Sequence, residues 1–289
     1  MKESEVGKVN VCCVISDSLR WDTFVDAEPL NILKLGKARK AYSVGCSTST
    51  SMHGYLLNRP PIGVGNGFFV HGKPRRTRYE SGVVLEPSSI RKWMPRYFRE
   101  HGYFTAFMSP NPVLIRVDDE LNGAYRKSFN HWAVDEYYEM PVGSATPQII
   151  RDLDLHVKMN RGQPIFVVIL LLDTHSPYHD GSGGVHLMNS SKPLLNHEHQ
   201  VEAMKYIDNV FPNFVNIFSK TERPTEFIFT SDHGENFGGD PGTVEERGWG
   251  HSSFRAELQF GEELFAIPFM RGRVDDWSKF KVHLVDDTE

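Results

Sequence analysis

Three short runs of consecutive apolar residues are prominent along the chain, and each is followed by polar or charged residues. They are VNVCCVIS at 9–16, PIFVVILLLD at 164–173 and the run within EFIFTS at 226–231. Unbroken apolar runs of this length are typical of strands buried on both faces of a parallel sheet. The run at 164–173 is the most hydrophobic, and we expect it to form the central strand.

Apolar residues recur at helical spacing between these runs. In residues 198–219 they repeat every three or four positions, which predicts an amphipathic helix with Pro212 as an irregularity. The segment SSIRKWMPRYFREHGYFTAFM at 88–108 begins with serines suited to capping, passes through a helical pattern to Gly102 and ends in a strand. Strands that alternate with helices predict an α/β fold, a doubly wound and mostly parallel sheet with helices on both faces.

Composition narrows the class of protein. The 289 residues, 39% of them apolar, favour one globular domain over residues 1–289. A net charge of −5 with both signs interspersed gives no reason to expect nucleic acid or an anionic membrane as a partner. The basic run KPRRTR at 73–78 is typical of a solvated loop, or of a loop that steers an anionic substrate. The oligomeric state stays open, with a homo-oligomer among the alternatives.

Cysteine usage and the apolar runs favour a cytoplasmic location. Two of the three cysteines are adjacent in an apolar run, which fits buried strand residues in a reducing compartment rather than a disulfide framework. The N-terminal residues lack the apolar core of a signal peptide, and the longest apolar run is too short to span a bilayer. We therefore expect no membrane partner.

Acidic and imidazole side chains follow all three apolar runs. Asp17 follows the first, Asp173 and His175 the second, and Asp232 and His233 the third. A single Asp-His-Gly is more often an Asx turn beside a surface histidine. In an open parallel sheet, however, the carboxyl ends of the strands meet at one edge, where ligands bind. Carboxylates with a neutral imidazole suit Zn²⁺ or Mn²⁺, so the pattern predicts a metal site.

A hydroxyl-rich segment is the candidate source of a nucleophile. GCSTSTSMHGYLLNRPP at 45–61 predicts a loop followed by a helix, with the hydroxyls at the helix N-terminus. Free backbone N–H groups and the helix dipole favour a developing anion there. An ordinary N-cap in a Ser/Thr-rich loop is the alternative.

These segments together resemble the alkaline phosphatase superfamily, in particular its sulfatase-like branch of sulfatases, phosphonate monoester hydrolases, and phosphoethanolamine and phosphoglycerol transferases. The resemblance runs nearly end to end. It rests on VISDSLRWDTF, TSTSMHGYLLNRPP, HGYFTAFMSPNP, FVVILLLDTHSPY, FIFTSDHGENFG, WGHSSF and ELFAIPFMRG. The SDHGE element is the most specific of them.

The resemblance implies a role for each matching residue. One divalent ion, Zn²⁺ or Mn²⁺, would be bound by Asp17, Asp232, His233 and the nucleophile. Registering TSTSMHGYLLNR against the sulfatase nucleophile helix puts Thr48 at the nucleophile position, with Ser47, Ser49 and Thr50 as alternatives. His175 and His251 fall where relatives hold the transferred group or protonate the leaving oxygen.

Further side chains are expected near the substrate. They are Arg20, Arg59 and Asp173, and for each arginine a structural ion pair is the commoner role. Asn111 in SPNP follows a strand and could contact substrate, but an Asx turn before Pro112 is the commoner role, so Asn111 is left out of the site. Position 177 is proline where two-metal relatives carry a histidine, so we expect one ion, although Asp173, His175, His179 and His251 leave room for a second.

Two departures from the family pattern shape the expected function. Cys46 is followed by STST, which lacks the signal for conversion to formylglycine, so the resemblance argues against ordinary sulfatase activity. The sequence stops at KVHLVDDTE, where relatives usually continue into a small C-terminal sheet, so this subdomain is expected to be short or absent. We predict a metal-dependent hydrolase of a small phosphate or phosphonate ester that acts through a phosphothreonine. The alternatives are a soluble phosphoryl transferase, a non-catalytic metal-binding relative and a sulfate-ester hydrolase.

Overall fold

The structure is a computed structural model. It describes residues 6–43, 45, 47–57, 69–70, 73–74, 93–120, 123–134, 137, 144–189, 192–221, 223–238, 262–277 and 280. Within these ranges the strands of the main sheet lie in the order β2-β11-β10-β1-β7-β5-β6. Their bounds are β1 Asn10–Ser16, β2 Arg39–Tyr42, β5 Phe104–Met108, β6 His131–Ala133, β7 Ile165–Leu171, β10 Thr225–Ser231 and β11 Ala266–Val274.

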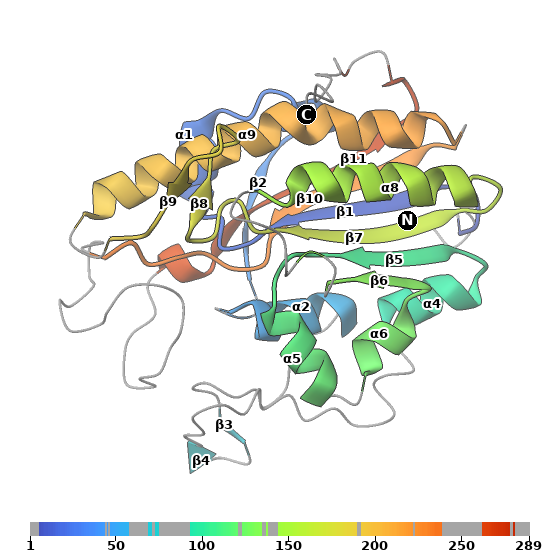
Figure 1. Cartoon of the computed structure of the whole chain (residues 1–289), viewed down its shortest axis with the longest axis horizontal. Coiled ribbons are helices and arrows are strands. Elements are labelled where there is room, and N and C mark those ends of the chain that lie inside the picture. The colour runs from blue at the N-terminus through green and yellow to red at the C-terminus, as the bar shows by residue number, and fades with distance from the viewer. Residues whose placement is uncertain are drawn as a thin grey trace.

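Helices cover both faces of this sheet (Figure 1). On one face lie α1 (Trp21–Ala27), α8 (Thr146–Asn160) and α9 (Pro193–Ser219). On the other lie α2 (Thr48–Leu57), α4 (Met94–Glu100), α5 (Val113–Glu120) and α6 (Ala124–Ser128). Each helical layer packs on a cluster of buried side chains from the sheet. The doubly wound α/β fold expected from the sequence is confirmed.

Short elements complete the described chain. They are the 3-10 helices η2 (Ile32–Leu35) and η4 (Glu262–Leu264) and two two-stranded pairs, β3 (Phe69–Val70) with β4 (Lys73–Pro74) and β8 (Tyr178–His179) with β9 (Val185–His186). No helix among the described residues is both long and apolar enough to cross a membrane.

Strand direction and register place the functional edge. β10, β1, β7, β5 and β6 run parallel, while β11 is antiparallel to both β10 and β2. Ser16 of β1 pairs with Ser231 of β10 and with Leu171 of β7, so these three strands end side by side. The run at 164–173 forms a fully buried strand, but β1 holds the middle position and β7 lies beside it. The prediction that this run forms the central strand was therefore wrong. High hydrophobicity indicates that a strand is buried on both faces, which is true of β1 and β7 alike, and does not predict the position of a strand within the sheet.

A proline inside α9 is matched by a side chain from a distant loop. Pro212 has no N–H, so the carbonyl of Asp208, four residues earlier, loses its helical partner. Asn31 Nδ2 donates to that carbonyl at 3.1 Å. The Asp208 carboxylate in turn accepts the backbone N–H groups of Asn31 and Ile32 at 2.9 and 2.8 Å. This reciprocal contact fixes the start of η2 on the irregular part of α9.

We expect Asp208→Ala to lower the free energy of unfolding by about 1–3 kcal/mol, because it removes the acceptor from two backbone N–H groups, and the Ile32 N–H is buried. Glu100→Ala is the matched control, since its ion pair with Arg96 is exposed. Its effect should lie within about 0.5 kcal/mol. Urea unfolding of the two variants measures both, and equal midpoints would show that the Asn31–Asp208 contact contributes nothing.

Candidate active site

The aligned ends of β1 and β10 bring three acidic and imidazole side chains together. Asp17 directly follows β1, and Asp232 and His233 directly follow β10. One ligand atom from each lies within 4.8 Å of the others, and all three side chains are 0% exposed. Among the residues that the structure describes, this is the one group of histidine, cysteine or acidic side chains arranged to hold a metal ion.

The two oxygens of Asp232 have different surroundings. Oδ1 accepts the backbone N–H groups of Ser18 and His233 at 3.0 and 2.9 Å. Oδ2 is buried, accepts no hydrogen bond of ordinary length and angle from the described residues and lies 3.4 Å from His233 Nε2, although the Thr48 hydroxyl is near enough to lower the pKa of Asp232. Burial, followed by repulsion from Asp17, raises the pKa of Asp232 well above its usual range. A buried carboxylate oxygen with no donor points to a missing positive charge beside it.

The tautomer of His233 follows from its backbone contact. Nδ1 lies 2.7 Å from the carbonyl oxygen of Gly234, so Nδ1 carries the proton and donates it. Nε2 is then an acceptor that faces Asp17 and Asp232. Burial lowers the pKa of His233, although Asp17 opposes the shift. A neutral imidazole with Nε2 unprotonated is the form that ligates a metal.

Thr48, the first residue of α2, lies against this group. Its Oγ1 is 3.2 Å from Asp17 Oδ2 and 3.4 Å from His233 Nε2, and the residue is 4% exposed. The loop before α2 is fixed by Ser43, whose hydroxyl contacts Ser51 Oγ at 3.0 Å and donates to the carbonyl oxygen of Asp232. The predicted nucleophile and the predicted metal ligands are therefore brought together.

The donor set fits a divalent cation. Two carboxylates, one neutral imidazole and one hydroxyl are the mixed oxygen and nitrogen ligands that Zn²⁺ and Mn²⁺ accept. The bare Asp232 Oδ2 supplies the structural observation in favour, since a cation would satisfy it. The residues that would hold the ion are Asp17, Thr48, Asp232 and His233.

Asn111 belongs to the site and also forms the turn expected from the sequence. Its Oδ1 accepts the Val113 N–H at 2.9 Å, which is the predicted Asx turn. Its Nδ2 donates to Asp17 Oδ2 at 2.7 Å and lies 3.4 Å from Thr48 Oγ1. The signal in the sequence was the position of SPNP directly after a strand, but a turn alone accounted for it.

The two predicted residues after β7 differ in their surroundings. His175 Nδ1 lies 2.5 Å from the carbonyl oxygen of Ser176, so Nδ1 is the nitrogen that donates to the backbone and Nε2 is the nitrogen left to exchange a proton, and His175 is close enough to His233 to lower the pKa of His233. Asp173 is 2% exposed and accepts the Thr146 hydroxyl at 2.5 Å, and burial raises its pKa. The described contacts join Asp173 to the start of α8, and His175 acts electrostatically on His233 of the metal-ligand group.

Arg20 forms an ion pair with Asp22, which is the structural role that the sequence offered as the alternative to substrate binding. Its guanidinium binds Asp22 at 2.6 Å, donates to the carbonyl oxygen of Glu235 at 3.2 Å and lies 4.4 Å above the ring of Phe237. A role on the substrate stays a prediction for Arg20 and for Asp173. Arg59 and His251 lie outside the described residues. Of the alternative nucleophiles, Ser47 and Ser49 contact each other at 3.3 Å, and the side chain of Thr50 is not described.

Gly234 explains why the Asp-His pair is followed by glycine. A Cβ at this position would lie 1.8 Å from the carbonyl oxygen of Glu263, and the Gly234 N–H donates to the carbonyl oxygen of Leu264 at 2.9 Å. The backbone after the metal ligands is thus pressed against the segment that leads into β11.

Gly234→Ala should lower the free energy of unfolding by about 3 kcal/mol or more, because backbone atoms must move to admit the methyl group. Gly162→Ala serves as the control, since no described atom lies within 4 Å of its Cβ position. Thermal unfolding of both variants with and without Mn²⁺ gives the comparison. Equal melting temperatures for the two variants would contradict the close approach.

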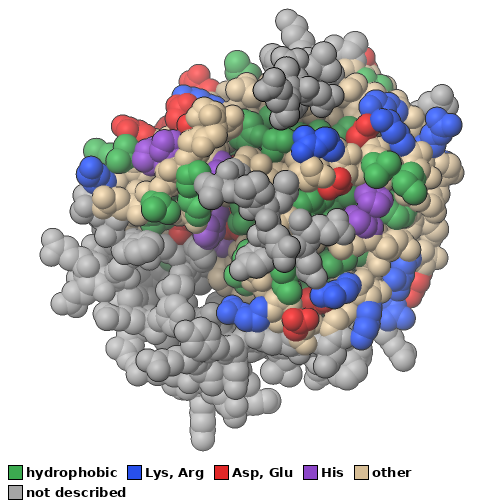
Figure 2. All heavy atoms as spheres, in the orientation of Figure 1, with side chains coloured by type: hydrophobic (Ala, Val, Ile, Leu, Met, Phe, Trp, Pro, Cys, Tyr) green, Lys and Arg blue, Asp and Glu red, His purple; other side chains and the backbone are tan. Residues whose placement is uncertain are grey.

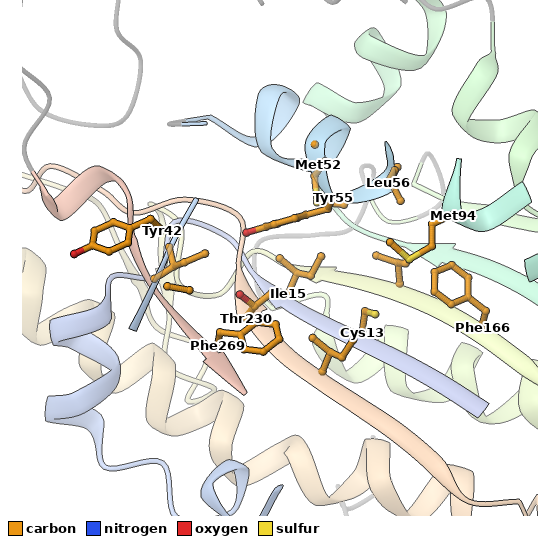
Figure 3. A pocket seen from close by; sticks show the side chains of 15 residues that line it. Cys13, Ile15, Tyr42, Met52, Tyr55, Leu56, Met94, Phe166, Thr230 and Phe269 are labelled. Carbon is orange, nitrogen blue, oxygen red and sulfur yellow. The ribbon is translucent and has the colours of Figure 1, made fainter. Parts of the chain in front are cut away.

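An apolar cavity of about 470 Å³ lies on the same face of the sheet as α2 (Figure 3). Its described lining includes Met52, Tyr55 and Leu56 from α2, with Ile15 and Thr230 from the sheet. The Tyr55 hydroxyl donates to the carbonyl oxygen of Ser231 at 2.6 Å, between this cavity and Asp232. The described lining contains no acidic, basic or imidazole side chain, whereas the strand ends carry Asp17, Asp232 and His233.

Histidine side chains gather at the end of the molecule that carries β8, β9 and the first turns of α9 (Figure 2). His186 stacks on His199 with ring centroids 4.3 Å apart, and its Nε2 lies 3.2 Å from Asp180 Oδ2. Nearby, His197 pairs with Asp26 at 3.3 Å. Each of these three histidines therefore contacts a neighbouring side chain, either a carboxylate or another imidazole ring.

Comparison with known proteins shows the family of the chain. Residues 10–279 match the family model described as Sulfatase. No curated protein sequence matches the chain significantly.

Several solved structures share the fold. The zinc complex of the C-terminal periplasmic domain of EptC from Escherichia coli is 13% identical, with a TM-score of 0.63, over 96% of this chain and 76% of that one. The corresponding domain of the phosphoethanolamine transferase EptC from Campylobacter jejuni is 14% identical, with a TM-score of 0.60, over 93% and 80%. The phosphoglycerol transferase GacH from Streptococcus pyogenes, bound to sn-glycerol-1-phosphate, is 11% identical, with a TM-score of 0.55, over 96% and 71%. At these identities the likeness concerns the fold.

Proposed function

Because the chain belongs to the sulfatase family, within the alkaline phosphatase superfamily, we propose that it is a metal-dependent hydrolase of small phosphate or phosphonate esters that acts through a covalent phosphothreonine. One observation carries the proposal. The hydroxyl of Thr48 lies 3.2 Å from Asp17 Oδ2 and 3.4 Å from His233 Nε2. The third ligand residue, Asp232, has a buried oxygen that accepts no ordinary hydrogen bond from the described residues. A nucleophile and a charged ligand set therefore converge on one point.

The first half of the reaction forms the intermediate. Thr48 Oγ attacks phosphorus, gives its proton to Asp17 Oδ2 and forms the new O–P bond as the bond from phosphorus to the leaving oxygen breaks. A divalent ion held by Asp17, Asp232 and His233 would stabilise the threonine alkoxide and offset charge on a non-bridging oxygen. His175, protonated at Nε2, would give that proton to the leaving oxygen.

The second half releases phosphate. Nε2 of His175, now unprotonated, accepts a proton from water, and the water oxygen attacks the phosphothreonine. The bond from phosphorus to Thr48 Oγ breaks, and the hydroxyl regains its proton from Asp17. His175 suits both steps because its Nδ1 is committed to the carbonyl oxygen of Ser176, which leaves Nε2 as the exchanging nitrogen. His251 stays a second candidate for this role.

The experiment is hydrolysis by purified protein of aryl phosphate monoester, phosphate diester, phosphonate monoester and sulfate ester substrates, each with Mn²⁺, with Zn²⁺ and with a chelator. Phosphorus ester turnover that disappears with the chelator is the expected result. Turnover of the sulfate ester alone would overturn the choice of substrate class. Absence of turnover on every ester, with metal still bound, would favour the non-catalytic relative.

A phosphoryl transferase is the second candidate, favoured by the transferase named in the C. jejuni and S. pyogenes structures. The same phosphothreonine would be captured by an acceptor alcohol instead of water. Adding glycerol or ethanolamine to the assay separates the two, since a transferase would form the new ester at the expense of free phosphate. The cytoplasmic location stays a prediction, and the EptC structures named above are periplasmic domains.

A further inference from the structure

We infer that Asn111 is a positioning residue that aims the Thr48 hydroxyl and holds Asp17 in its ligating orientation, an inference that rests on the proposed reaction of Thr48. Asn111 lies between β5 and α5 and is 4% exposed, and β5 and β10 are on opposite sides of β1 in the sheet. The Asn111 side chain is a neutral amide, so it acts by hydrogen bonding and not by charge. This role depends on which half of the amide faces the site.

The amide orientation is determined by its surroundings. Asn111 Oδ1 accepts the Val113 N–H at 2.9 Å, so the oxygen is directed to the start of α5. The Asn111 backbone N–H donates to Ser109 Oγ at 3.1 Å, and the Ser109 N–H donates to the carbonyl oxygen of Ala133 on β6. The NH₂ group therefore faces Asp17 and Thr48, and both ends of the residue are fixed to the sheet and helix.

The NH₂ group completes a triangle of three side chains. It donates to Asp17 Oδ2 at 2.7 Å and lies 3.4 Å from Thr48 Oγ1, and Thr48 Oγ1 is 3.2 Å from the same Asp17 oxygen. Thr48 thus gives its proton to Asp17 and accepts from Asn111. One lone pair of Oγ1 remains, on the side of His233 Nε2. Asn111 selects the Thr48 rotamer in which the attacking lone pair faces the ligand group.

The neutral amide also limits the charge of the site. Asp17 and Asp232 are both fully buried, and each oxygen of Asp17 already receives a donor, Ser18 Oγ at 2.9 Å on Oδ1 and Asn111 Nδ2 on Oδ2. A carboxylate in the place of Asn111 would lie 2.7 Å from Asp17 Oδ2 as a third negative charge. It would strengthen attraction for a cation while removing the donor that orients Thr48.

Two substitutions at Asn111 separate these effects. Asn111→Ala should lower kcat by about 10–100-fold with little change in KM, and weaken Mn²⁺ binding in calorimetric titration, since support of a metal ligand is worth about that much. Asn111→Asp, nearly the same in shape, should lower kcat at least as far while binding Mn²⁺ as tightly as the unaltered protein or more tightly. A residue that only stabilises the loop would not give the result expected for Asn111→Asp, in which kcat falls while Mn²⁺ affinity is kept or increased.

The control is Asn130→Ala, which removes another loop asparagine whose Oδ1 accepts the Thr105 N–H and hydroxyl at 3.0 and 2.9 Å. It should lower thermal stability while leaving kcat and the Mn²⁺ affinity unchanged. Full activity of Asn111→Asp would overturn the inference, because a carboxylate cannot donate, and so would equal Mn²⁺ affinities of Asn111→Ala and the unaltered protein. If the unaltered protein hydrolysed no ester, the proposed function would fail, and the Mn²⁺ titrations would still decide the role of Asn111 toward Asp17.

Discussion

Thr48→Ala is expected to reduce metal-dependent hydrolysis of the best phosphorus ester by about 10³-fold or more, the range typical of losing a nucleophile. No other hydroxyl is shown against both Asp17 and His233 within the described residues. Thr48→Ser is the matched control, because it keeps the oxygen and removes only a methyl group. It should retain a measurable part of the activity.

The intermediate itself can be trapped. Protein quenched in acid during turnover should carry one additional phosphoryl group, and fragmentation should place it on residue 48. The additional mass should be absent from Thr48→Ala. A phosphoryl group found on Ser47, Ser49 or Thr50 would move the nucleophile to that residue while leaving the reaction class intact. Undiminished turnover by Thr48→Ala, without any adduct, would instead contradict a threonine nucleophile.

Asp232→Asn should abolish measurable Mn²⁺ or Zn²⁺ binding and with it the turnover, because it removes one of the two carboxylates of the ligand group. In calorimetric titration we expect affinity to fall by more than about 100-fold, beyond the loss typical of a residue that only supports a ligand. The amide oxygen introduced by this substitution can still accept the Ser18 and His233 N–H groups. The loss would therefore come from the missing charge rather than from a collapsed loop.

The same change should stabilise the metal-free protein, by about 1–3 kcal/mol at neutral pH, because a buried charge beside Asp17 is replaced by a neutral amide. The pKa of Asp232 is raised in the folded state, so this carboxyl favours folding below its unfolded pKa of about 3.9 and loses that contribution as pH rises through the folded pKa. The stability advantage of Asp232→Asn over the metal-free parent should therefore grow as pH rises above about 4. Urea unfolding with a chelator across this range tests both, and a variant less stable than the parent would contradict the buried repulsion.

The position of the metal-ligand residues at the carboxyl ends of the strands could be predicted from the sequence, because the apolar runs predict the strands and parallel strands end at the same edge of a sheet. Unbroken apolar runs predicted β1, β7 and β10, and parallel strands end at one edge, so Asp17, Asp232 and His233 converge. Which strand is central could not be predicted, since burial on both faces is common to β1 and β7. The hydroxyl-rich segment predicted a helix that begins at the site, and Thr48 is its first residue.

Side-chain direction was beyond the reach of the sequence. Asn111 satisfies the turn pattern and the site at once, so a correct local explanation concealed its second contact. Asp173 follows its strand as Asp17 does, yet its carboxylate binds Thr146 at the start of α8. The partner of each acid depends on which helix lies above it, which the spacing of residues along the chain does not encode. Asn31, matched to the irregular turn at Pro212, is a similar case of distant pairing.

The pairing of β2 has a consequence for the order in which the protein matures on the ribosome. β2 leads to Ser43 and Thr48, and its strand partner is β11, which spans Ala266–Val274 and joins it to β10. A nascent chain that ends before β11 has the nucleophile segment but no strand to hold it beside Asp232. Because synthesis proceeds from the N-terminus, we expect hydrolytic competence to arise only when β11, the last described strand, emerges, long after Asp17 and Thr48 have been translated.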